Sequence, residues 1–202
     1  MPSPEYTPEQ RRVLLSLARA SIRHGLETGR PLAVDTKAFD PALQKRRAAF
    51  VTLNERGQLR GCIGSLEAYR PLVADVAENA FNAAFRDPRF PPVTPREFPD
   101  LRIHISVLSE PEPLAFRDEA ELLASLRPGI DGLILEDRGL RGTFLPSVWE
   151  QLPDKREFLA HLKLKAGLPP DHWSPTLRVW RYTTESFSEE EVDPRDEDSP
   201  GT

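Results

Sequence analysis

The stretch Leu59-Arg-Gly-Cys-Ile-Gly-Ser-Leu66 constrains the fold most, because it places two glycines inside a segment that otherwise alternates like a β-strand. Glycine inside a strand marks a point where another backbone or a ligand comes close. Gly61 and Gly64 flank Cys62, the only cysteine, and Arg60 stands beside them. Two interpretations are open: a tight bend against a helix with Cys62 as a small buried residue, or a ligand site.

This stretch lies in a predicted hairpin. Residues 47–53 and 58–64 read as its strands, joined by a glycine-containing turn. Strict alternation places Arg60 and Cys62 on the same face of the second strand. Residues 71–86 follow with apolar side chains at helical spacing, which predicts a well-formed amphipathic helix.

A second hairpin is predicted at residues 130–136 and 139–145. Its Leu140-Arg-Gly-Thr-Phe144 echoes Leu59-Arg-Gly-Cys-Ile63, which suggests an internal duplication. Hairpins among single strands and helices predict an α+β fold with an antiparallel or mixed sheet and flanking helices, rather than a repeating βαβ fold.

Two further segments carry candidate site residues. The loop at residues 87–93 holds three prolines, and its Asp87 and Arg89 are close enough to pair. It reads either as a rigid plug or as a loop that positions binding residues. Residues 101–108 alternate as a strand with one apolar and one polar face, and His104 lies on the polar face. We expect Arg60, Cys62 and the loop to line one shared cleft, with His104 nearby.

Composition excludes several classes of protein. The net charge of −5 arises from residues 188–202, which hold seven acidic residues against one arginine and read as an acidic disordered tail after a domain at 1–187. The near-neutral remainder argues against nucleic-acid binding. No apolar run is long enough to span a membrane, and a start without a signal-peptide core predicts a cytoplasmic protein. Cys62 and His104 are too few ligands for a usual zinc site, so no metal is expected.

The motifs LRGCIG at 59–64, NAFNAAFRDPRFPPV at 79–93 and LRIHISVLSEPEPL at 101–114 resemble the AMMECR domain family, also called AmmeMemoRadiSam system protein A. The resemblance covers roughly residues 8–187. It implies two unequal lobes and an association with Memo-type and radical-SAM proteins, without implying a reaction. The family's site positions map to Arg60, Gly61, Cys62 and Gly64.

Two functions therefore compete. The first is a binding or accessory protein that holds a small anionic ligand or a peptide through five residues: Arg60, Gly61, Gly64, Asp87 and Arg89. The alternative is an enzyme with Cys62 as nucleophile or acceptor and His104 as the base that activates it. Whether the chain is an enzyme stays open, and no cofactor is expected in either case.

Overall fold

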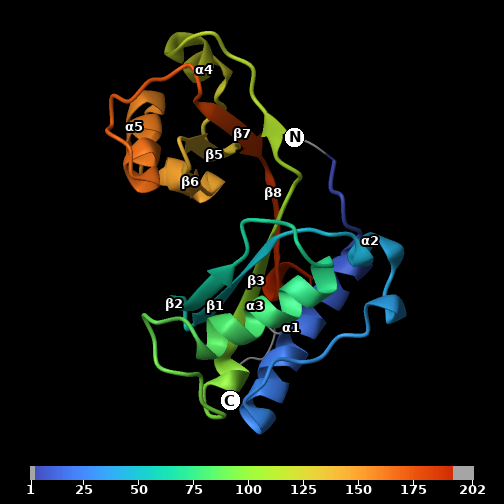
Figure 1. The fold of residues 1–202 in the computed structure, drawn as a ribbon. Coiled ribbons are helices and arrows are strands. Elements are labelled where there is room, and N and C mark those ends of the chain that lie inside the picture. The colour runs from blue at the N-terminus through green and yellow to red at the C-terminus, as the bar shows by residue number, and fades with distance from the viewer. Residues whose placement is uncertain (1–2, 193–202) are drawn as a thin grey trace. The chain divides into compact units, whose positions relative to one another are not determined.

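The computed structural model describes residues 3–192, which form two compact units (Figure 1). The first comprises the described residues up to Leu108 and those from Glu185 onward, and the second comprises Ser109–Thr184. Each unit contains one four-stranded sheet with helices beside it. The predicted α+β class with two unequal lobes is confirmed.

The helices and strands follow one another in this order: α1 (Pro8–Thr28), α2 (Pro41–Gln44), β1 (Ala49–Glu55), β2 (Gln58–Gly64), α3 (Leu72–Phe85), β3 (Leu101–Leu108), β4 (Glu112–Pro113), α4 (Glu119–Ser125), β5 (Gly132–Asp137), β6 (Leu140–Phe144), α5 (Lys155–Ala166), β7 (Arg178–Tyr182), β8 (Thr184–Ser188) and α6 (Glu189–Val192). The two predicted hairpins and the predicted central helix are all present, with ends shifted by one or two residues.

The sheet of the first unit has the strand order β2-β1-β3-β8, with β1 antiparallel to both neighbours. One face carries Val51, Leu53, Ile103 and Ile105, which are fully buried in a core with α1 and α3 (Figure 1). This alternation follows from strand geometry, because every second side chain points to the same face. The opposite face carries half-buried polar residues, and the candidate site lies there.

Gly61 allows α3 to lie directly against β2. A Cβ atom at this position would overlap the backbone carbonyl oxygen of Ala83 in α3. Gly64 plays a different part, since a Cβ there would overlap the ring of Phe50 on the neighbouring strand. The predicted close approach is therefore real at both glycines, and at Gly61 the approaching group is a helix backbone.

The second unit repeats the topology of the first. Its sheet has the order β4-β7-β5-β6, and the series β5, β6, α5, β7 matches β1, β2, α3, β3 in both chain order and sheet order. Both hairpins turn through a non-glycine residue and a glycine at positive φ, Arg56-Gly57 and Arg138-Gly139. A Cβ at Gly142 would lie 2.8 Å from the backbone nitrogen of Ala166 in α5. This shared ββαβ arrangement supports the duplication that the sequence echo suggests.

The chain folds beyond the boundary predicted at residue 187. Ser188 ends β8, and Glu189 begins the short helix α6. The Glu189 carboxylate accepts hydrogen bonds from Arg19 Nε at 2.6 Å and from the backbone nitrogen of Ile103 at 3.0 Å. Residues 188–192 therefore belong to the first unit, which corrects the start of the predicted tail. The rest of that tail, 193–202, lies outside the described residues.

No helix within residues 3–192 combines the length and the apolar character that a membrane crossing requires. The longest, α1, has a polar side and ends at Gly29 in the left-handed conformation with φ 70°. A reciprocal capping box between Thr7 and Gln10 starts it.

We predict that Gly61→Ala lowers the free energy of unfolding by at least about 2 kcal/mol, because the helix backbone cannot move aside as a side chain can. Gly142→Ala should cost about 1 kcal/mol, since its tightest contact is longer. Urea unfolding of both variants gives the comparison. Equal stability of Gly61→Ala and the wild type would contradict the close contact between β2 and α3.

Candidate functional site

A row of three polar side chains crosses the sheet of the first unit. In the strand register, Thr52 of β1 lies directly opposite Cys62 of β2 on one side and His104 of β3 on the other. All three are half-buried, and they share the sheet face opposite to that packed against α1 and α3. The Thr52 hydroxyl donates a hydrogen bond to Cys62 Sγ at 3.2 Å. Thr52 is thus the direct partner of the thiol.

His104 contacts other hydroxyl groups. Its Nε2 lies 3.4 Å from Ser106 Oγ, which is in turn 2.8 Å from Ser186 Oγ of β8. Neighbouring strands are about 4.8 Å apart, so the backbones of Cys62 and His104, with β1 between them, are separated by about 10 Å. The structure brings the two predicted catalytic residues to one face without direct contact between them.

Asp87 and Arg89 close the outer edge of β2. Asp87 Oδ2 accepts the backbone N–H of Cys62 at 3.0 Å, and Arg89 Nη2 lies 3.4 Å from the Cys62 carbonyl oxygen. The two side chains also pair with each other at 2.7 Å. An edge strand exposes such backbone groups to unwanted pairing, and here a carboxylate and a guanidinium take the place of a neighbouring strand.

The electrostatics of this pair follow from the contacts. Asp87 is buried, with its side chain 2% exposed, whereas that of Arg89 is 55% exposed. The hydrogen bonds from the Arg89 side chain, assisted by the backbone N–H groups of Cys62 and Arg89, hold the pKa of Asp87 well below its usual range. The carboxylate therefore stays ionised at neutral pH and keeps the loop against the strand.

Arg60 lies in a β-bulge. Leu53 pairs with Gly61 while Asn54 pairs with Leu59, so Arg60 has no cross-strand partner. The alternation that the sequence analysis carried through Arg60 is interrupted there, and it does not place Arg60 in the row of Cys62, Thr52 and His104. The predicted common face for Arg60 and Cys62 is therefore not supported.

The Arg60 guanidinium binds Glu97 instead. Its Nε donates to Glu97 Oε1 at 2.9 Å, and this interaction lowers the pKa of Glu97 to about 2. Arg60 and Arg89 both lie over the ring of Phe90, at 5.9 and 5.5 Å from its centroid. Arg60 Nη1 is buried and has no hydrogen-bond partner within residues 3–192. The loop thus gathers Arg60, Asp87 and Arg89 around the edge of β2.

The paired arginines at the edge of β2 and the polar side chains on the sheet face determine which kinds of ligand this region can bind. Both guanidinium groups at this edge already bind carboxylates, so an anion would have to displace Glu97 or Asp87. The accessible functional groups on the sheet face are a thiol, hydroxyls and an imidazole, which exchange hydrogen bonds without a fixed charge. Within the described part of the chain, no group of three or more His, Cys, Asp or Glu side chains is placed to hold a metal ion.

The second unit provides an internal comparison. At the positions equivalent to Cys62, Thr52 and His104, its register aligns Thr143, Ile134 and Trp180. Thr143 and Ile134 are buried there, so the equivalent row is mainly apolar. The polar row is therefore a property of the first unit alone and is not required by the shared topology.

Sequence reasoning missed two residues of this region, Thr52 and Glu97. Thr52 could have been found, because it alternates onto the polar face of the strand that pairs with Cys62. Glu97 has a local role in a turn, where its carboxylate accepts hydrogen bonds from the backbone and hydroxyl of Thr94 at 2.8 and 2.9 Å. Its second role, binding Arg60, depends on a contact across 37 positions that no local pattern reveals.

The chain is similar to known proteins of one family over most of its length. Residues 15–187 match the model of the AMMECR1 family. A protein from Methanothermobacter thermautotrophicus is 41% identical over 92% of this chain and 99% of its own length, and protein MJ0810 from Methanocaldococcus jannaschii is 38% identical over 95% and 94%. The crystal structure of an uncharacterised protein, PH0010 from Pyrococcus horikoshii, is similar with a TM-score of 0.81 and 37% identity, covering 94% of this chain and 96% of that one.

We predict that Asp87→Asn lowers the free energy of unfolding by about 1–3 kcal/mol, because the amide loses the ion pair and accepts less strongly from Cys62. The folded pKa of Asp87 lies below the ordinary carboxyl value of about 4, so its stabilisation is full above that pH and falls as the pH decreases. The variant should therefore lose less stability than the wild type on acidification below pH 4. Asp100→Asn is the control: the exposed Asp100 side chain pairs with the exposed Arg56, and its loss should change stability by less than about 0.5 kcal/mol.

Proposed function

This chain belongs to the AMMECR1 family, and we propose that it acts as a binding protein whose recognition surface is the polar sheet face at Cys62, Thr52 and His104. The observation that carries the proposal is the register of this row. Three half-buried polar residues from three strands lie side by side on the sheet face opposite to the one packed against α1 and α3. A surface built on rigid strands keeps its geometry when it binds, which lowers the entropy cost of association.

The contacts that hold the backbone of Cys62 also favour a role in binding a ligand. Asp87 and Arg89 hold both backbone polar groups of Cys62, and Gly61 is fixed against α3. The backbone of Cys62 is thereby held in one position on the strand. Arg60, Gly61, Gly64, Asp87 and Arg89, predicted as ligand-binding residues, act in this proposal as the frame of the site.

The ligand that suits this face is an uncharged hydrogen-bonding group, such as the backbone of a partner's polypeptide segment. Arg60 and Arg89 each already pair with a carboxylate, so a free anion would have to compete with Glu97 or Asp87 at this edge. Thiol, hydroxyl and imidazole groups can each donate or accept, which fits amide groups. The family resemblance supplies the candidate partners, Memo-type and radical-SAM proteins, and gives the chain an accessory role beside them.

The alternative, an enzyme with Cys62 as nucleophile, requires a base at the sulfur. Cys62 Sγ accepts a hydrogen bond from the Thr52 hydroxyl, which is no base at neutral pH. His104 lies across β1 and contacts Ser106 instead. The geometry therefore favours binding, and the reactivity of the thiol separates the two functions.

We predict that His104→Ala and Thr52→Val each weaken binding to a Memo-type or radical-SAM protein of the same organism by about tenfold, because each removes a hydrogen-bonding group from the surface. Biolayer interferometry with purified proteins measures this. His161→Ala, at an exposed position of α5, is the matched control and should bind as the wild type does. Wild-type chain that binds neither partner, or His104→Ala that binds as tightly as the control, would contradict the proposal.

We also predict that iodoacetamide modifies Cys62 at pH 7.5 no faster than it modifies the thiol of glutathione. The sulfur is half-buried and receives a hydrogen bond from a neutral hydroxyl. Mass spectrometry of timed samples gives the rate. Faster modification that slows in His104→Ala would instead establish His104 as the activating base and favour the enzyme.

A further inference from the structure

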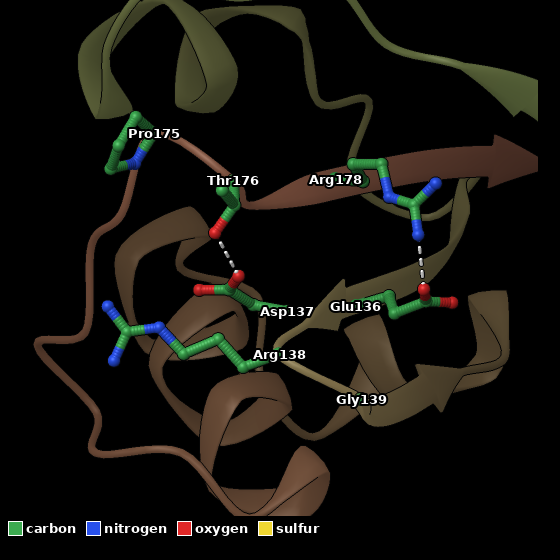
Figure 2. A pocket seen from close by; sticks show the side chains of 7 residues that line it. All are labelled: Glu136, Asp137, Arg138, Gly139, Pro175, Thr176 and Arg178. Atoms are coloured by element: carbon green, nitrogen blue, oxygen red, sulfur yellow. Dashed lines mark hydrogen bonds and ion pairs between the residues drawn. The ribbon is translucent and has the colours of Figure 1, made fainter.

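A groove crosses the second unit where β7 begins. It consists of two adjoining hollows of about 310 and 540 Å³, which share Pro175 and Arg178 in their walls (Figure 2 shows the larger). The smaller hollow lies between residues 113–117 and residues 173–180. The larger one lies between the β5–β6 turn and the segment before β7. This groove is separate from the polar row of the first unit.

The short length of β4 produces the smaller hollow. β4 pairs with β7 only at Glu112 and Pro113, and one further hydrogen bond joins Leu114 N to Val179 O at 2.9 Å. Beyond this point the rings of Phe116 and Trp173 contact each other, with their centroids 5.6 Å apart. Apolar and aromatic side chains therefore line a gap between two backbones.

A buried carboxylate holds the wall of the groove in place. Asp137 Oδ1 accepts a hydrogen bond from the Thr176 hydroxyl at 2.6 Å, and its Oδ2 lies 2.6 Å from His172 Nε2 (the Thr176 contact is drawn in Figure 2). Trp173 lies between these two anchored residues in the chain. These contacts lower the pKa of Asp137 to about 2, so the anchor is ionised at neutral pH. The groove is thus formed before any ligand arrives.

The rim of the groove carries arginines. The side chains of Arg117 and Arg178 are 89% and 64% exposed, although each pairs with a glutamate. Arg138 lines the larger hollow and has no carboxylate partner within the described residues. Figure 2 shows its side chain extending away from the Arg178–Glu136 pair. An acidic group of a ligand can therefore pair with the Arg138 guanidinium without displacing a carboxylate of the protein.

We propose that this groove binds an extended, proline-containing acidic peptide of a partner protein. Aromatic side chains and prolines along a shallow groove are the surface that polyproline II segments recognise, and such segments need no backbone pairing from the sheet. Several lining residues, among them Pro113 and Pro175, are themselves exposed. Because the site is open, it would bury little of the surface of a compact small molecule, whereas an extended peptide can contact both hollows. The unpaired Arg138 selects the acidic side chain.

The test uses the full chain and the peptide EPPEPPEP, with KPPKPPKP and EAAEAAEA as matched peptides. Trp173 and Trp180 line the groove, while Trp149 is buried in a stack with Phe158, so tryptophan fluorescence reports on binding. We expect the acidic proline peptide to change the emission with saturation, and the other two peptides to bind at least tenfold more weakly. Arg138→Glu should weaken EPPEPPEP binding at least fivefold.

The matched control is Arg56→Glu, at the equivalent turn of the first unit, where the residue has the same φ of 51°. It should leave the Kd unchanged. Trp173→Phe, which keeps an aromatic ring in the wall, should reduce the fluorescence change and so locate the peptide. The proposal is overturned if no peptide alters the emission at millimolar concentration, or if Arg138→Glu and Arg56→Glu bind EPPEPPEP equally well.

Discussion

The contact between Gly61 and the backbone of α3 is the constraint on which the first unit depends. Because Ala83 occupies the space where a side chain would stand, the helix ends close to the edge of β2. The loop that follows α3 can then return along that edge, where Asp87 and Arg89 reach the backbone of Cys62. The close packing that Gly61 permits thus positions the residues that surround the candidate site. The interpretation of the motif as a packing feature and its interpretation as a ligand site are therefore compatible.

Buried carboxylates perform a similar task throughout the molecule. Asp75, fully buried in the first turn of α3, accepts hydrogen bonds from the backbone nitrogen of Ala49, the hydroxyl of Ser65 and Nε of Arg70, which ties the helix to β1 and to the residue that follows β2. Asp137 joins the β5–β6 turn to the segment before β7. A buried carboxylate is costly unless several donors satisfy it, and here each has them. Loops held in this way present their side chains in a fixed arrangement.

Local patterns in the sequence predicted much of this fold. Helical and strand periodicities located α3, β3 and both hairpins. β8 was missed because Thr184–Ser188 follows β7 without a turn and has only one buried apolar residue, Phe187. The bulge at Arg60 was also missed, since it arises from pairing with β1 and leaves no mark in the local pattern. Contacts distant in sequence therefore decide the details of the site, while local periodicity decides the elements.

The second unit is inserted between two neighbouring strands of the first sheet, because the chain leaves after β3 and returns in β8. Its ends are joined to each other, with Ser109 N bonded to Thr183 O at 2.8 Å and Thr183 N to Ser109 Oγ at 2.9 Å. A folded insert therefore acts as a short connection, whereas an unfolded one becomes a long loop whose closure costs about 3 kcal/mol more. Folding of the insert thus lowers the entropy cost of adding β8 to the other sheet, so the stabilities of the two units are coupled through the connectivity of the chain.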